Sequence, residues 1–414
     1  MKVLIKLENN FFSRFILSAF LLFLCSLTFA KNNCTKTFEL STKENTIVDQ
    51  CGNYFKLKSV NWYGAHDVAE VVGGLDKQPL KNIVLLIKRG GFNSVRLPFS
   101  NDMIGDKKIV DPKYIAANPE LKEKTPLQIF DIVVKALTDA GIVVILNNHT
   151  TLSQWCCGYD YNSLWYHPDY QSVEKWISDW TYLASRYRDN PLVAGADLRN
   201  EVRTGHFYKT VFPIYPNWGK GGQNDWKSAA KKAGDAIHQI NPNLLIIVEG
   251  INWTGIPIIN GHRPLLTPIK DSPLVLDHPN KLVYEVHVYG YTGPTHTGDD
   301  SSSPKQMRYR DMDEATLKST FDSEFGYVLE KGQRYTAPVW LGEFGVGSEA
   351  SEQEQVWFQH TANYLIEKEM GWGFWSLNPE HVDGTPEGYG LLNDTWTGYR
   401  NDWRNASIER LLQS

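Results

Sequence analysis

Short apolar runs alternate with longer amphipathic stretches along most of the chain. Each run spans three to five residues and is followed by a polar or aromatic residue, and the next stretch carries apolar residues at helical spacing. Short apolar runs without strict alternation are typical of strands that are buried on both faces. Eight such strands are predicted, at residues 57–60, 94–97, 143–146, 193–196, 244–248, 282–286, 339–341 and 373–375.

The stretches between these strands predict helices. Residues 79–90, for example, place Leu80, Ile83 and Ile87 on one face of a helix. The other predicted helices cover residues 127–140, 173–186, 226–240 and 353–368, and a last helix over 401–412 closes the chain.

Strand–helix alternation repeated eight times predicts an α/β fold, the (β/α)8 TIM barrel. A doubly wound open sheet is the alternative, but the first strand is not followed by the Gly-rich phosphate loop of such folds. We expect a single domain over residues 31–414. It should open with a short β-hairpin whose arms are residues 46–48 and 54–57, on either side of a turn.

Polar and aromatic side chains gather where the predicted strands end. In a parallel barrel the C-terminal ends of all strands open on one face, so these side chains should converge there. A purely structural rim would not need two His, a Tyr, an Arg and two Glu together. The strand-end residues are Asn61, Trp62, Arg96, Asn147, Asn148, His149, Asn200, Glu201, Glu249, His287, Tyr289, Glu343 and Trp375.

Two of these residues, Glu201 and Glu343, form a candidate catalytic pair. A buried carboxylate is costly unless it is paired or used in chemistry. Hydrolysis of a glycosidic bond needs two carboxyl groups, one to protonate the leaving oxygen and one to attack or to activate water. The structural alternative is that each Glu pairs with a neighbouring Arg. Glu249 also ends a strand, and we interpret it as support behind the site.

The first thirty residues have the pattern of an export signal. Lys2, Lys6 and Arg14 form a basic start, an apolar stretch follows, and Ala30 is a small residue suited to signal peptidase. We expect cleavage after Ala30 and a secreted protein, extracellular or periplasmic, and an uncleaved anchor is the alternative. The formal net charge of −5 and the lack of a basic tract exclude nucleic acid as an expected partner.

Four cysteines remain after the export segment, which itself contains Cys25. In an exported chain we favour a Cys34–Cys51 disulfide. Cys156 and Cys157 then pair with each other or stay free. Metal binding is the rival reading, but no CxxC or His-rich spacing supports it.

Six motifs in order resemble glycoside hydrolase family five. They are Ser94-Val95-Arg96-Leu97-Pro98, Asn147-Asn148-His149, Asn200-Glu201, His287-Val288-Tyr289, Gly342-Glu343-Phe344-Gly345 and Phe374-Trp375-Ser376. The segments 226–237 and 241–250 look most like the bacterial endo-β-1,4-glucanases of that family. The likeness extends from about Val60 to Trp396.

The resemblance implies a retaining endo-β-1,4-glucanase. Glu201 matches the acid/base, whose pKa should be raised, and Glu343 matches the nucleophile, kept ionised by Arg96. Double displacement implies carboxyl groups ~5–5.5 Å apart.

The remaining matched residues are implied to bind the sugar. Asn200 would hold the sugar's 2-hydroxyl, and His149 and His287 would bind that sugar or orient around it. Tyr289 would touch the nucleophile, and Trp375 would form a stacking floor for the sugar ring. Two positions depart from the family pattern. Val202 stands where Pro is usual, and Leu377 stands where many relatives have a second Trp, so one sugar contact is in doubt.

The expected partner is thus a polysaccharide or oligosaccharide such as cellulose or a related β-glucan. We expect no metal, no cofactor, no stable membrane association after cleavage, and a monomer. The alternatives are a relative that acts on mannan, xyloglucan or a glucosylated lipid, a zinc hydrolase, and a non-catalytic barrel that only binds sugar.

Overall fold

Eight parallel strands close into a barrel in the order β10-β3-β4-β5-β6-β7-β8-β9. The computed structural model describes residues 37–157, 162–206, 212–252, 254, 263–293 and 307–414. Every barrel strand overlaps one of the eight predicted strands, so the predicted (β/α)8 barrel is confirmed. The strands are β3 (Lys58–Asn61), β4 (Ser94–Ser100), β5 (Val143–Thr150), β6 (Val193–Asp197), β7 (Leu245–Glu249), β8 (Leu282–His287), β9 (Val339–Phe344) and β10 (Gly371–Phe374).

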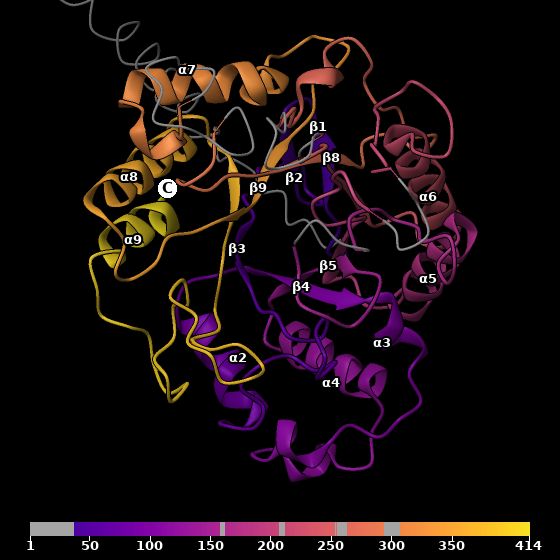
Figure 1. Ribbon diagram of the computed structural model, residues 1–414, viewed down its shortest axis with the longest axis vertical. Helices are drawn as coiled ribbons and strands as arrows, with labels where there is room; N and C mark the ends of the chain where they lie inside the picture. Colours follow the sequence, from indigo (N-terminus) through magenta and orange to yellow (C-terminus); the bar gives the residue numbers. More distant parts are fainter. Residues whose placement is uncertain (1–36, 158–161, 207–211, 253, 255–262, 294–306) are drawn as a thin grey trace, which may run out of the picture. The chain divides into compact units, whose positions relative to one another are not determined.

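Helices surround this barrel, and α5 and α6 lie side by side on its outside (Figure 1). All six predicted helices are present within a few residues of their expected bounds. The α-helices of the described chain are α2 (Leu80–Arg89), α3 (Asn101–Gly105), α4 (Pro126–Asp139), α5 (Val173–Arg186), α6 (Trp226–Ile240), α7 (Glu314–Glu324), α8 (Glu352–Glu367) and α9 (Asn405–Gln413).

Local capping explains where several helices begin. The Ser172 side chain accepts a hydrogen bond from the backbone N–H of Lys175 at the start of α5, and Asp225 caps α6 in the same way. Each helix then buries one face. In α5 that face carries Trp176 and Trp180, which pack in the core.

Two helices were not predicted. Helix α3 has five residues directly after β4, too few to show a period, and Ser100 caps it. Helix α7 is mostly polar and buries only a thin apolar line that includes Leu317 and Phe321. Between β7 and β8 the described residues form a 3-10 turn at Thr267–Ile269 and no α-helix, so the alternation is not perfect.

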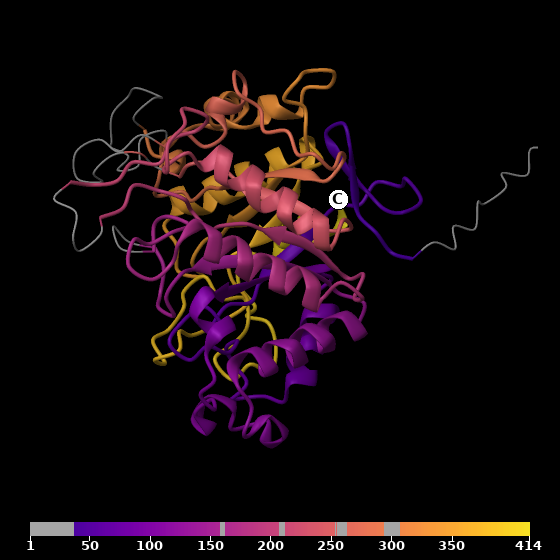
Figure 2. The same cartoon turned by 90° about the vertical axis from the view of Figure 1, so that its right-hand side faces the viewer.

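The predicted N-terminal hairpin is present and its predicted arm at residues 46–48 is confirmed, but the other arm, at residues 54–57, was wrong. Strands β1 (Ser41–Lys43) and β2 (Thr46–Val48) pair antiparallel around Glu44, whose positive φ of 52° suits a tight turn. The expected second arm contributes only an isolated bridge from Tyr54 to Val48. The hairpin, indigo in Figure 2, packs Leu40 and Ile47 against the start of the barrel strands.

The barrel interior changes from apolar to polar along each strand. In β5 the inward series runs from Val143 and Ile145 to Asn147 and then to His149. The lower layer is a sealed apolar core, closed by Trp340 and the hairpin. The upper layer therefore holds the charged and polar side chains at the C-terminal ends of the strands, where barrel active sites lie.

The predicted export segment, residues 1–30, lies outside the described residues. So does Cys34, the expected partner of Cys51, which is itself in a disulfide. Among the described helices, none combines the length and the apolar character needed to cross a membrane.

Candidate active site

The two candidate catalytic carboxylates face each other across the barrel mouth. Glu343 lies in β9, and Glu201 follows β6. Carboxylate oxygens of both residues and a ring nitrogen of His287 all lie within 4.8 Å of one another. The Glu201 side chain is 15% exposed and that of Glu343 only 6%, so both carboxylates sit at the water-accessible end of a buried cluster.

Arg96 is the cation at the centre of this cluster. Its side chain is fully buried, and Nε donates to Asp197 Oδ2 at 2.7 Å. Nη1 donates to Asn61 Oδ1 at 3.1 Å and to Glu343, and Nη2 donates to Asn200 Oδ1 at 2.8 Å. One guanidinium thus orients four strand-end side chains and neutralises part of the carboxylate charge.

Removing the Arg96 guanidinium should destabilise the fold strongly. Burial opposes its charge, but the Asp197, Glu285 and Glu343 carboxylates raise the pKa of Arg96 above its ordinary value. Arg96→Met would leave these carboxylates without their cation. We expect the free energy of unfolding at pH 7 to fall by about 3–5 kcal/mol in guanidinium denaturation. A change below about 1 kcal/mol, the range of exposed ion pairs, would contradict this role.

His287 lies between the carboxylates. Nδ1 is 3.1 Å from Glu201 Oε1 and 3.6 Å from Glu343 Oε2, and Nε2 is 3.1 Å from Glu285 Oε1. Burial lowers the pKa of His287, but the surrounding carboxylates, Glu249 foremost, raise it well above the usual range. The ring is therefore an imidazolium near neutral pH.

The pKa of Glu201 differs from the expectation. Burial alone would raise it, but the hydrogen bond and charge of His287, with smaller effects of Arg203 and Arg263, lower the pKa of Glu201 to about 2. The expected raised pKa is therefore wrong. These opposite shifts favour the proton on the His287 ring, whose Nδ1 faces Glu201 Oε1.

The sugar-binding candidates surround the same pair. Tyr289 donates a hydrogen bond to Glu343 Oε2 at 2.9 Å. Trp375 stacks on Tyr63, with ring centroids 5.1 Å apart, and on His149 at 5.7 Å. These contacts leave Trp375 only 8% exposed, so it presents a narrow strip to the mouth.

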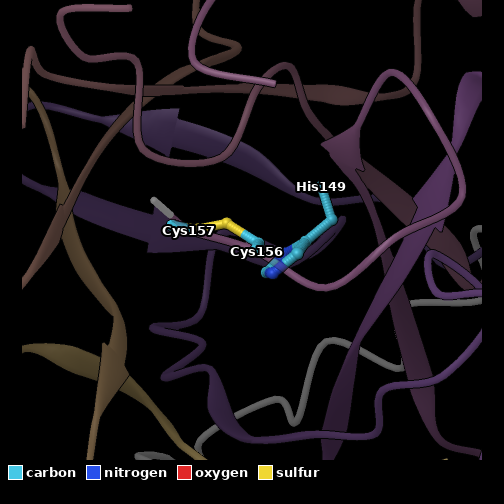
Figure 3. A group of neighbouring side chains, drawn as sticks. All are labelled: His149, Cys156 and Cys157. Carbon is cyan, nitrogen blue, oxygen red and sulfur yellow. A yellow bond between two sulfur atoms is a disulfide. The ribbon is translucent and has the colours of Figure 1, made fainter. Parts of the chain in front are cut away.

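Cys156 and Cys157 form a disulfide between adjacent residues, one of the two states expected from the sequence. Figure 3 shows the pair beside His149. The Asn200 side-chain amide donates to both sulfur atoms, at 3.4 and 3.3 Å. Because its oxygen accepts from Arg96, the orientation of this amide is set from both sides.

The structure brings all eight sequence-predicted site residues into one connected cluster. Four further members were not proposed as site residues: Asn61, Asp197 and Glu285 in the Arg96 network, and Tyr63 beneath Trp375. The period of two along β8, which places Glu285 and His287 on one side, is the signal that identifies Glu285.

His66 also lies beside the candidate active site, although the sequence pattern did not identify it. Its ring is fully buried, 4.3 Å from the His149 ring between centroids, and neither nitrogen has a hydrogen-bond partner among the described residues. Burial, with the charges of Arg96 and His381, lowers the pKa of His66 to about 3. The folded protein thus holds a neutral ring.

Acid should destabilise the protein through His66. In the unfolded chain the His66 ring takes up a proton near pH 6.5, whereas in the folded chain it does not. The free energy of unfolding is therefore highest above that pH and falls as the pH drops. At pH 5 the loss should be about 2 kcal/mol. His66→Phe should remove about that much of the difference between urea denaturation at pH 8 and pH 5. An unchanged difference would assign the acid sensitivity to other groups.

Two groups of described side chains bring three metal-ligand atoms within 4.8 Å of one another. One is Glu201, His287 and Glu343, and the other is His149 with the Cys156–Cys157 pair. In the first, the atoms bind each other and Tyr289. In the second, the sulfurs are joined and accept from an amide, and His149 Nδ1 is 2.7 Å from Asn147 Oδ1. Both groups are thus already satisfied by protein partners.

A family comparison agrees with this geometry. The model of the family described as cellulase (glycosyl hydrolase family 5) matches residues 49–381. An endoglucanase of Paenibacillus polymyxa is 32% identical over 86% of this chain and 83% of its own length. The major extracellular endoglucanase of Xanthomonas campestris is 30% identical over 86% of this chain and 68% of its own length.

Solved structures give the same picture. A hyperthermophilic endocellulase from the archaeon Pyrococcus horikoshii has a TM-score of 0.73 at 29% identity, covering 91% of this chain and 98% of that one. The catalytic domain of the major endoglucanase from Xanthomonas campestris has a TM-score of 0.74 at 27% identity, covering 91% and 100%.

Proposed function

Because this chain belongs to glycosyl hydrolase family 5 and is a glycoside hydrolase, we propose that it cleaves β-1,4-glucan within the chain and retains the anomeric configuration. The observation that carries the proposal is the Glu201–Glu343 pair, whose oxygens lie within 4.8 Å. A gap of this size admits the anomeric carbon of one sugar but not an additional water, which favours double displacement.

In the first step, Glu343 attacks the anomeric carbon and forms a covalent glycosyl-enzyme while the leaving oxygen takes a proton from Glu201. In the second step, Glu201 removes a proton from water, which displaces Glu343. Tyr289 and Arg96 support the Glu343 carboxylate through their hydrogen bonds and keep an oxygen aimed at the sugar.

The transferred proton starts on the His287–Glu201 pair. Before a sugar binds it is held on the imidazolium, whose Nδ1 lies 3.1 Å from Glu201 Oε1. A bound sugar excludes water from Glu201, and this desolvation favours the protonated carboxyl. The proton then moves along the existing hydrogen bond before it reaches the leaving oxygen.

The remaining side chains suit a flat, neutral sugar. Trp375 offers an aromatic edge, and His149 and Asn200 offer polar atoms beside it. Several relatives are endoglucanases or endocellulases by name, which favours a glucan over the mannan, xyloglucan or glucosylated lipid alternatives.

A substrate screen tests this choice. Initial rates on carboxymethylcellulose, mannan and xyloglucan should be highest on carboxymethylcellulose, with a fall in viscosity that precedes most reducing-end release. A rate on mannan or xyloglucan at least about tenfold higher would overturn the assigned substrate.

We also propose that the protein is exported through residues 1–30 and acts as a monomer. The Xanthomonas campestris relative is extracellular by name. N-terminal sequencing of protein from the culture medium or periplasm should begin at Lys31, and protein that begins at Met1 would contradict the proposal.

A further inference from the structure

Glu249 is a buried carboxyl directly behind Glu201. It ends β7 and is 1% exposed. Oε2 accepts a hydrogen bond from the backbone N–H of Glu201. Oε1 has no hydrogen-bond partner among the described residues and lies 3.4 Å from His287 Nδ1, the nitrogen that also faces the Glu201 carboxylate. Glu249 therefore touches both members of the pair that holds the proton.

The backbone of Glu201 needs this support. Its φ is +42°, in the left-handed region that is strained for a residue with a side chain. The carbonyl of Glu201 accepts from Arg203 Nη1 at 3.0 Å, so the residue is held on both sides. The turn aims the Glu201 side chain back over the mouth, toward His287.

We propose that Glu249 is a positioning residue for the acid/base: through Oε2 it holds the Glu201 main chain in the left-handed turn that aims the Glu201 carboxyl toward His287. The inference rests on the proposed role of Glu201. It assigns a function to a carboxyl that does not itself reach the mouth.

The electrostatics indicate which property of Glu249 matters. Burial raises its pKa well above the usual range; His287 opposes this, and Glu285 and Glu201 add to it. In either protonation state the oxygen that faces Glu201 can accept the hydrogen bond of its backbone N–H. Gln has the same shape and retains such an acceptor, whereas Leu has nearly the same volume and none.

The experiment compares Glu249→Gln and Glu249→Leu on two substrates. Cellotetraose has a poor leaving group that needs a proton from Glu201, whereas 2,4-dinitrophenyl β-cellobioside has one that departs without it. The parameter is kcat/KM, because it reports the first chemical step. Glu249→Leu should lose about 100-fold on cellotetraose and less than about threefold on the dinitrophenyl substrate. Glu249→Gln should stay within about threefold on both.

The matched control is Glu324→Leu. Glu324 is another buried carboxyl, 6% exposed, that accepts from Tyr309 at 2.6 Å outside the site. Glu324→Leu should lower the melting temperature of the protein without changing the ratio of kcat/KM between the two substrates. If Glu249→Leu does not fold, Glu249→Met repeats the test, since it also lacks an oxygen acceptor.

Equal losses on both substrates would assign Glu249 a merely structural role and overturn the inference. So would equal losses for the Gln and Leu variants on cellotetraose. In either case the activity of the unaltered enzyme leaves the proposed function standing. An unaltered enzyme that cleaves neither substrate would instead overturn the proposed function and, with it, this inference.

Discussion

Glu343→Gln should reduce turnover of any β-glucan on the order of 10⁴-fold or more, while the fold remains intact. The amide has the shape of the carboxylate but cannot form the glycosyl-enzyme. The substitution removes one of the carboxylates around Arg96, and Asp197 and Glu285 remain within 2.7 and 3.3 Å of its Nε. The guanidinium therefore keeps its compensation, and the barrel should stay folded.

Steady-state kinetics on carboxymethylcellulose and a circular dichroism melt check this result together. Tyr289→Phe is a useful comparison, because it removes a hydrogen bond to the same carboxylate and leaves the nucleophile in place. It should cost far less, about 10- to 100-fold. Full activity in Glu343→Gln would refute the assignment of the nucleophile.

Glu201→Ala should show a different kinetic defect, because Glu201 acts as the acid in the first step and as the base in the second. Turnover of cellotetraose should fall on the order of 10³-fold, since neither the leaving oxygen nor the attacking water is assisted. Added azide needs no base. With the dinitrophenyl substrate it should restore turnover and yield a β-glycosyl azide, because it attacks the glycosyl-enzyme from the vacated side.

The identity of the azide product gives this test its strength. The β product is expected from an acid/base variant of a retaining enzyme, and the same reagent should not rescue Glu343→Gln. An α-glycosyl azide from Glu201→Ala would mean that the two residues have exchanged roles.

The barrel could be predicted from the sequence because a strand buried on both faces has a distinctive composition. Runs such as 143–146 and 244–248 have few alternatives once helices separate them. For several strands the sequence pattern placed the C-terminal end too early. The ladder of β5 continues to Thr150, through polar residues that face the barrel interior. Polar side chains inside a barrel mouth look like a loop in the sequence.

The candidate residues could be predicted for the same reason: the fold makes strand ends converge. The contacts that each residue makes could not be predicted from the sequence. The opposite pKa shifts of Glu201 and His287 depend on a 3.1 Å hydrogen bond between residues 86 positions apart and, for His287, on the Glu249 and Glu343 carboxylates. The hydrogen bond from the Glu201 backbone to Glu249 requires a left-handed turn at Glu201. The sequence does not predict this turn, because Glu rarely adopts it.

The hairpin shows a further limit. Its turn was expected at 49–53, where Asp49 does accept from the Cys51 and Asn53 backbones. The main pairing instead forms one turn earlier, around Glu44. The strand that pairs, Ser41–Lys43, carries no apolar residue, so the apolar pattern does not identify it; Leu40, directly before it, packs with Ile47 beneath the barrel.

Proton NMR of a cello-oligosaccharide digest decides most directly whether Glu201 and Glu343 act by double displacement. Spectra recorded within the first minutes, before the new reducing ends equilibrate, should show the β-anomer appearing first. An initial excess of the α-anomer would mean single displacement by water, which a pair of carboxylates this close would not allow.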